Sequence, residues 1–305
     1  MQQTNHADHD CTSQLPDDCI VRLHDDGILQ VKGQDAKRFL QGQLTCDIEK
    51  VVSDKLTLGA HCNPQGRIIS LFYLFMHDEA YFLIMPHSLI ATATTALKKY
   101  IAFYRAEMSD VSDVFNLMGT MKRIDKANAL NHNFILLSFP SIHSRFMLIG
   151  KKEMLNERWI KESNLTTVDA DTWKTINVKE GIPAIYPATS TQFLPHEINL
   201  PQLNAIDFDK GCYTGQEIIA RMHYRGKLKK KMYCASIETE SPLIAGQPIY
   251  AHINHETQVA GTIVDWSQLP NNHKQKIALI VINEVDAKNQ HLSPNENHDA
   301  FFTLT

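Results

Sequence analysis

The stretch KGCYTGQEIIAR, residues 210–221, places one cysteine between a glycine and an aromatic ring, directly before an apolar run. The run predicts a helix that begins near Gln216, and a helix start presents unpaired backbone N–H groups that favour an anion. The cation of Lys210 adds to this effect, so the position favours the thiolate form of Cys212. On these residues alone two interpretations stay open: a reactive thiol, or a small spacer in a strand-to-helix turn.

The composition indicates a globular chain with no overall affinity for polyanions. Its 305 residues are 43% hydrophobic and 21% charged, which allows a large core and two or three domains. Thirty basic and 34 acidic residues give a formal charge of -4, so contact with RNA requires a local basic patch. The segment RGKLKKK, residues 225–231, has five basic residues in seven and is either a solvated linker or such a patch.

The N-terminal residues and the cysteines predict a cytoplasmic protein. Residues 1–19 have neither the basic start nor the apolar core of a secretory signal and are expected to form a mobile tail. The longest apolar stretch, IISLFYLFM at 68–76, is shorter than the ~18 residues that span a bilayer, so no membrane contact is expected. The six cysteines contain no C-x-x-C pair, which favours a reducing compartment and no metal site.

The apolar pattern predicts α+β elements followed by a small β-domain. Residues 21–33 alternate around a DDG turn and predict a hairpin, and the apolar side chains of 35–45 share one helical face. A second hairpin over 67–85 and a helix over 89–101 follow, and after Lys231 short apolar segments predict a barrel. The expected parts are a tail (1–19), an α+β core of two interleaved portions (20–224), a basic junction (225–231) and a C-terminal β-barrel (232–305).

Two long segments, residues 31–47 and 173–233, resemble the YgfZ family of folate-binding, tRNA-modification proteins. Their most specific element is KGCYTGQE, with FLPHEINL upstream. The resemblance implies an aminomethyltransferase-like α+β fold, with two ferredoxin-like portions and a C-terminal β-barrel around a central channel. It also implies tetrahydrofolate or a derivative as the ligand, transient contacts with iron–sulfur enzymes or assembly proteins, and an indirect role in tRNA thiomethylation.

The chain departs from the related aminomethyltransferases at the acidic pair that assists their one-carbon transfer. Ser70 and Leu71 occupy these positions, and neither side chain exchanges a proton near neutral pH. Aminomethyl transfer is therefore expected to be absent, and an accessory protein is favoured over an enzyme. The alternative is a folate-dependent one-carbon transferase with a relocated base, for which the candidates are His61, His196 and Glu197.

A folate site needs a stacking surface, a polar anchor and a cation. The resemblance implies Trp173 as a stacking surface. A second tryptophan of the family's site falls at Asp26, so folate is expected to bind more weakly or in a shifted pose. The glutamate that the aminomethyltransferases place near the pterin falls at Lys179, and Glu180 follows it.

The other candidate ligand residues lie in KGCYTGQE and the helix after it. Lys210 and Tyr213 belong to the motif, and Arg221 and Arg225 lie one turn apart on the predicted helix. We expect the anionic folate tail near Lys210 or the two arginines. The resemblance also favours Cys212 as a functional thiol that faces the ligand channel.

Overall fold

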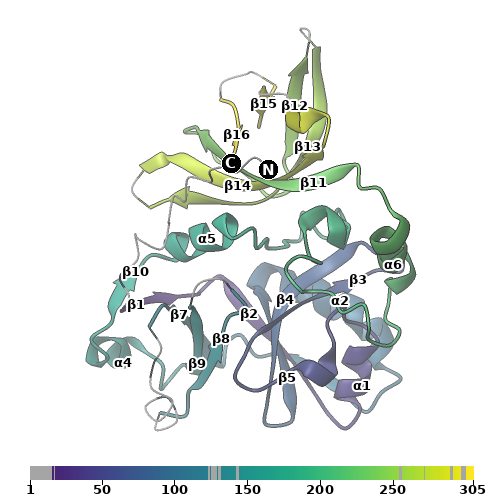
Figure 1. The fold of residues 1–305 in the computed structure, drawn as a ribbon. Coiled ribbons are helices and arrows are strands. Elements are labelled where there is room, and N and C mark those ends of the chain that lie inside the picture. Colours follow the sequence, from purple (N-terminus) through teal and green to yellow (C-terminus); the bar gives the residue numbers. More distant parts are fainter. Residues whose placement is uncertain are drawn as a thin grey trace, which may run out of the picture.

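The computed structural model consists of three β-sheets and one central helix layer (Figure 1). Two five-stranded sheets lie side by side, the six-stranded sheet lies above them, and helix α5 (Ala170–Lys179) lies between. The structure describes residues 16, 18–122, 124, 129, 132–141, 144–253, 256–270, 272–288, 291–296 and 300–305. Most of the predicted tail lies outside these residues, and its last residue, Cys19, already belongs to a strand.

The first sheet has the strand order β10 (Thr166–Val168), β1 (Cys19–Arg22), β7 (Phe115–Thr120), β9 (Phe146–Lys151) and β8 (Ile135–Ser138). The second has the order β3 (Thr57–Cys62), β4 (Ile68–His77), β5 (Ala80–Pro86), β2 (Asp26–Lys32) and β6 (Glu107–Asp110). The third has the order β15 (Leu292–Ser293), β12 (Pro248–Ile253), β13 (Glu256–Leu269), β14 (Asn272–Asn283), β11 (Lys230–Glu238) and β16 (Thr303–Leu304). The other α-helices formed by the described residues are α1 (Ala36–Gln41), α2 (Ile90–Ile101), α4 (Glu157–Glu162) and α6 (Gln216–Arg225).

Several elements form as their sequence patterns predict. Strands β4 and β5 pair as the expected second hairpin, with the left-handed residues Asp78 and Glu79 at its turn. Helix α2 follows it and buries Ile90, Ala93 and Leu97 on one face. The apolar run after KGCYTGQE is the helix α6, and the segments after Lys231 are strands of the third sheet.

The predicted hairpin at residues 21–33 is wrong. Strand β1 pairs with β7 and β10 of the first sheet, whereas β2 pairs with β5 and β6 of the second. The DDG segment therefore crosses between the two sheets. Within it, the carbonyl of Asp25 accepts a hydrogen bond from the amide of His87 at 2.8 Å. Period-two alternation defines two faces of a strand, but it does not identify the strand's partner.

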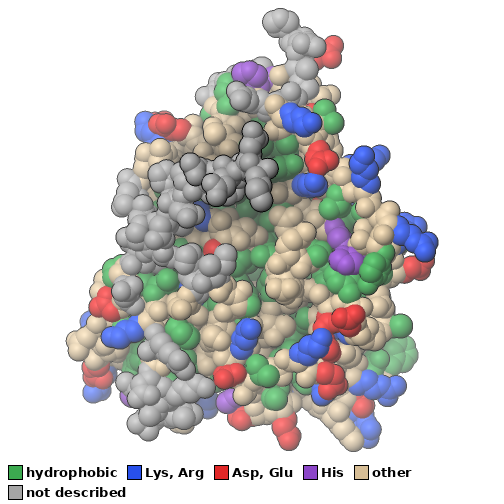
Figure 2. Space-filling view, in the orientation of Figure 1, with side chains coloured by type: hydrophobic (Ala, Val, Ile, Leu, Met, Phe, Trp, Pro, Cys, Tyr) green, Lys and Arg blue, Asp and Glu red, His purple; other side chains and the backbone are tan. Residues whose placement is uncertain are grey.

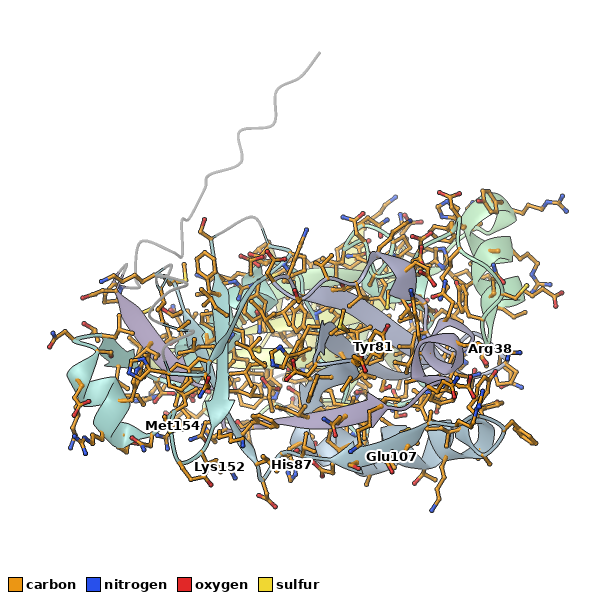
Figure 3. The ribbon with its side chains drawn as sticks, turned by 90° about the horizontal axis from the view of Figure 1, so that it is seen from below. Arg38, Tyr81, His87, Glu107, Lys152 and Met154 are labelled. Atoms are coloured by element: carbon orange, nitrogen blue, oxygen red, sulfur yellow. The ribbon has the colours of Figure 1, made fainter. Side chains whose placement is uncertain are left out.

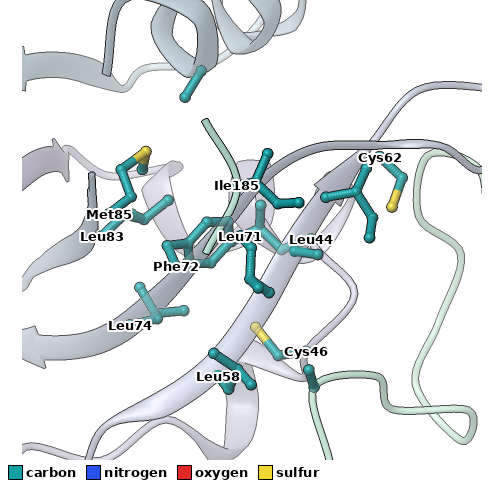
Figure 4. Packing of buried hydrophobic residues seen from close by; sticks show 14 of the residues in the cluster. Leu44, Cys46, Leu58, Cys62, Leu71, Phe72, Leu74, Leu83, Met85 and Ile185 are labelled. Atoms are coloured by element: carbon teal, nitrogen blue, oxygen red, sulfur yellow. The ribbon is translucent and has the colours of Figure 1, made fainter. Parts of the chain in front are cut away.

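One apolar core joins the second sheet to the third sheet. Leu71, Phe72 and Met85 of the second sheet pack with Ile185 from the segment after α5 (Figure 4). The same cluster includes Leu279 of β14, so the third sheet closes over this core. Burial of each such side chain stabilises the fold by about 1.5 to 3 kcal/mol.

The third sheet is curled, and its two edges meet at an isolated bridge between Leu292 and Phe302. Its first strand begins at Lys230, inside the predicted basic junction, and α6 ends at Arg225. Within the described ranges, no helix is both long and apolar enough to cross a bilayer. In the same ranges, no three or more His, Cys, Asp or Glu side chains converge as a metal site requires.

Candidate functional site

A cavity of about 510 Å³ lies where the second sheet, α5 and the third sheet meet. Strand β2 contributes Asp26 at its start, and the exposed side chains of His24 and His87 lie at the cavity's rim. Figure 3 shows His87 at the outer edge of the molecule in that view. Its inner wall is formed by Leu58, Leu71, Tyr73, Trp173, Lys174, Asn177, Tyr186 and Asp265.

The indole of Trp173 is held in one place from three sides. Its ring lies edge-on to Phe139, with centroids 5.5 Å apart, and the guanidinium carbon of Arg145 lies 5.0 Å from its centroid. Gly119 lies behind it, where an added Cβ would approach the indole carbons to 2.9 Å. Trp173 is only 4% exposed, so it is both a core residue and part of the cavity wall.

Arg145 is fully buried and forms an ion pair behind the cavity wall. Its Nη2 donates to Glu180 Oε2 at 2.6 Å, and its Nη1 donates to Asn177 Oδ1 at 2.7 Å. Glu180 also accepts a hydrogen bond from the hydroxyl of Ser141 at 3.0 Å. The carboxylate of Glu180 is thus engaged beneath the wall, and neither it nor Lys179 is among the cavity-lining residues.

Asp265 of β13 connects the third sheet to α5 and to the segment that follows it. Its carboxylate accepts hydrogen bonds from Tyr186 Oη at 3.0 Å and from the amide of Ala184 at 3.1 Å. Lys174 Nζ lies 3.2 Å from the same carboxylate and 5.4 Å from the centroid of the Tyr186 ring. Burial and the charge of Asp265 raise the pKa of Tyr186, which keeps its hydroxyl protonated as a donor.

Asp26 is a carboxylate of the cavity that lacks such support. Among the described residues no hydrogen bond or ion pair to its carboxylate is found, and the residue is half-buried. Burial raises the pKa of Asp26 to about 6, the charge of Asp25 raises it further, and Lys174 opposes the rise. A pKa near neutrality in a cavity is typical of a functional carboxylate.

Asp26→Asn is expected to stabilise the protein at pH 7 by on the order of 1 to 3 kcal/mol, because it removes a charge that burial disfavours. The pKa of Asp26 is higher in the folded state than in the unfolded state, so the native protein takes up the proton first as the pH falls. The carboxylate therefore destabilises the fold increasingly from about pH 4 to pH 6. Urea unfolding at pH 7 and pH 4 measures this, and an equal gain at both pH values would contradict it.

The KGCYTGQE motif lies away from this cavity, against the end of α1. Lys210 Nζ donates to three backbone carbonyls, those of Gln41, Leu44 and Cys46, at 2.7 to 2.9 Å. Burial lowers the pKa of Lys210 to about 8, and its ammonium group is occupied as an internal cap.

The rest of the motif presents Cys212 at the surface. Tyr213 is buried, and Gly215 has a φ of 84° with its Cα so close to the β3–β4 hairpin that a Cβ would lie 2.5 Å from the carbonyl oxygen of Asn63. Cys212 itself is exposed. None of Lys210, Cys212 and Tyr213 is among the cavity-lining residues, so the structure does not bring the predicted thiol to this cavity.

Arg221 and Arg225 are exposed on α6 and do not line the cavity either. Of the predicted site residues, the structure brings only Trp173 and Asp26 to it. Sequence reasoning missed Lys174, which directly follows Trp173. It also missed the residues His24, His87, Asn177, Tyr186 and Asp265, which carry no local signal because they come from separate segments.

The three candidates for a relocated base also lie elsewhere. His61 is buried, burial lowers its pKa to about 4, and no hydrogen-bond partner is found for its ring within the described residues. His196 is buried beside His223, and burial lowers its pKa as well. The Glu197 carboxylate accepts from the amide of Leu194 at 2.8 Å, so it caps a short 3-10 turn.

Comparison with known proteins assigns the chain to a family. No protein-family model matches it. The tRNA-modifying protein YgfZ of Aliivibrio fischeri strain MJ11 is 30% identical over 286 residues, which cover 91% of this chain and 89% of the relative. The protein of the same name from Vibrio atlanticus is 30% identical over 283 residues, covering 90% of this chain and 87% of the relative.

The fold matches a crystal structure of the glycine cleavage system aminomethyltransferase T from Bartonella henselae. The TM-score is 0.67 with 11% identity, over 94% of this chain and 84% of that one. The predicted mixed α+β, aminomethyltransferase-like fold is therefore confirmed, whereas the ferredoxin-like portions and the central channel stay predictions. With relatives of this identity and coverage, the chain belongs to the YgfZ family of tRNA-modifying proteins.

Proposed function

We propose that the protein binds tetrahydrofolate or a derivative in the cavity beside Trp173, and that it supports iron–sulfur enzymes and thereby tRNA modification. The observation that carries the ligand assignment is the combination of an aromatic wall, a cation and an unpartnered carboxylate in one cavity. The names of the relatives support the link to tRNA modification. The fold supports folate because an aminomethyltransferase has the same architecture.

The cavity fits the chemical demands of folate. Its volume of about 510 Å³ is within the range of pockets that enclose small molecules. A pterin presents N–H donors on its edge, and the carboxylate of Asp26 is an acceptor without a partner among the described residues. Lys174 lies 34% exposed in the same cavity and supplies the cation that an anionic glutamate tail requires.

The position of Leu71 favours binding over aminomethyl transfer. Leu71 lines the cavity, whereas Ser70 is buried opposite His61 in the β3–β4 pairing. A leucine supplies no proton and no negative charge to a reacting one-carbon unit. In the proposed role, the residues that line the cavity orient the folate and exclude water from it.

One observation favours the alternative, a folate-dependent one-carbon transferase. Asp26, with its pKa raised to about 6 by burial, is placed in the cavity as a general base must be. Turnover of a methylene- or formyl-folate by the purified protein, lost in Asp26→Asn, would identify the transferase. Stoichiometric binding without turnover identifies the accessory role.

Cys212 is proposed to act on the protein surface, toward a partner protein. The buried side chains of Lys210 and Tyr213 anchor the segment on either side of it, and Gly211 has open space around its Cα. A single exposed thiolate can form a mixed disulfide or donate one ligand to a cluster in transit, but it cannot hold a cluster alone. The proposed partners are therefore iron–sulfur enzymes or assembly proteins in transient contact.

Trp173→Ala is expected to weaken tetrahydrofolate binding at least about tenfold, because it removes the aromatic wall of the cavity. Anaerobic calorimetric titration of the full-length protein measures this. Trp159→Ala is the matched control, since Trp159 is also buried, lies edge-on to Phe134, and does not line the cavity.

Both variants lose a buried indole and about 3 to 5 kcal/mol of stability, so a general effect of destabilisation would lower both affinities equally. Unchanged affinity for tetrahydrofolate in a folded Trp173→Ala variant would show that folate does not bind in this cavity.

A further inference from the structure

Helix α6 and the start of β11 carry a concentration of positive charge that the proposed folate site does not use. Residues 216–231 contain six basic side chains and one acidic one, Glu217 at the N-terminal end of α6. The molecule as a whole has a formal charge of -4. Figure 2 shows Lys and Arg side chains on the side of the molecule that carries these elements.

Most of these cations form no ion pair with another described residue. Lys231 pairs with Glu284. For the exposed residues Arg221, Arg225, Lys227, Lys229 and Lys230, no ion pair is found within the described part of the chain. Five such cations on one helix and the strand after it form a surface on which a polyanion can bind.

An aromatic stack lies within the same surface. The ring of Phe208 stacks on His223 at a centroid distance of 3.8 Å and an interplanar angle of 21°. Tyr224 lies edge-on to His223, with centroids 4.8 Å apart, and is 69% exposed. An exposed tyrosine that neighbouring rings hold in place presents a face on which a planar group can stack at little entropic cost.

We propose that this surface, formed by Phe208, His223, Tyr224 and the basic residues Arg221, Arg225, Lys227, Lys229 and Lys230, binds an unpaired stretch of RNA. Tyr224 stacks on a base, and the cations contact the flanking phosphates. Helix α6 has ten residues and is about 15 Å long, which corresponds to roughly four stacked nucleotides. The assignment does not depend on folate.

The combination of features favours RNA over other polyanions. An anionic membrane or an acidic protein would be attracted by the charge alone, and neither needs an aromatic face between the cations. Nucleotides alternate a negative phosphate with a planar base, and this alternation matches cations that surround a ring stack. Unpaired RNA exposes its bases, whereas in a duplex they are enclosed.

The test is fluorescence anisotropy of the full-length protein with a labelled stem–loop RNA, at several salt concentrations. We expect affinity to fall with salt, with a log–log slope of about -0.7 for each phosphate contacted. Tyr224→Ala is expected to weaken binding at least about fivefold with the salt slope unchanged, and Tyr224→Phe to retain it. Arg225→Gln is expected to make the slope shallower by about 0.7.

Lys98→Gln is the matched control, because Lys98 is an exposed lysine on α2, outside the surface. It should leave RNA affinity unchanged. The proposal would be overturned if a blunt RNA duplex, or vesicles with anionic lipids, bound as tightly as the stem–loop RNA and Tyr224→Ala did not weaken that binding. An equal loss in Lys98→Gln and Arg225→Gln would also overturn it. Tetrahydrofolate binding should be unaffected in every one of these variants.

Discussion

Arg145→Met is expected to destabilise the protein by about 3 to 5 kcal/mol. The substitution removes the guanidinium from a fully buried ion pair and leaves the buried carboxylate of Glu180 without this cation. It also removes the cation that lies 5.0 Å from the Trp173 ring. Guanidinium chloride unfolding at pH 7 measures the change in the free energy of unfolding.

The double variant Arg145→Met/Glu180→Met is expected to regain much of this loss, because no charge then remains unpaired. Arg158→Met is the control for the loss of an arginine ion pair. Arg158 bonds Glu162 at 2.8 Å with its side chain 85% exposed, and its loss should cost less than about 1 kcal/mol. Similar losses for Arg145→Met and Arg158→Met would contradict the role given to burial.

Cys212→Ser is expected to fold normally and fail to restore tRNA thiomethylation in cells that lack the protein. The side chain is exposed, so the substitution disturbs no packing, whereas a hydroxyl cannot form a mixed disulfide or bind a cluster as a thiolate does. Quantifying the thiomethylated nucleoside by mass spectrometry measures the outcome. Cys234→Ser, a half-buried thiol outside the motif, is the control and should complement.

Site-resolved alkylation at pH 7 gives an independent reading of the same thiol. Cys212 is expected to react far faster than Cys46 and Cys62, which are buried. Burial raises the pKa of Cys46 to about 12 and also raises that of Cys62, so almost none of either is thiolate at pH 7. Full complementation by Cys212→Ser would show that the thiol is only a spacer, even if Cys212 is the most reactive cysteine.

The parts of the fold that depend on local sequence could be predicted. The helix α6 follows from its apolar run, and Gly215 before it adopts the left-handed conformation that such a turn uses. The hairpin β4–β5 follows from alternation around a short turn. Local patterns carry this information because the interactions that form these elements join residues close in the chain.

The site depends on contacts that sequence patterns do not contain. From the sequence, Lys210 is expected to be a free cation beside a thiol. In the structure its ammonium group donates to the carbonyl of Gln41 at the end of α1, 169 residues earlier in the chain. The pairing of Arg145 with Glu180 and of Lys174 with Asp265 is equally non-local. Asp26 could be placed by family resemblance, but its unpartnered state in the cavity required the fold.

The position of Asp265 on β13 has a consequence for the order of biosynthesis. Trp173, Lys174 and the whole second sheet leave the ribosome before β13 is translated, and domains begin to fold as they emerge. Until β13 arrives, Lys174 lacks the carboxylate of Asp265 and the amide of Ala184 lacks its acceptor in the third sheet. This wall of the cavity is therefore completed only after the second sheet and α5 have left the ribosome.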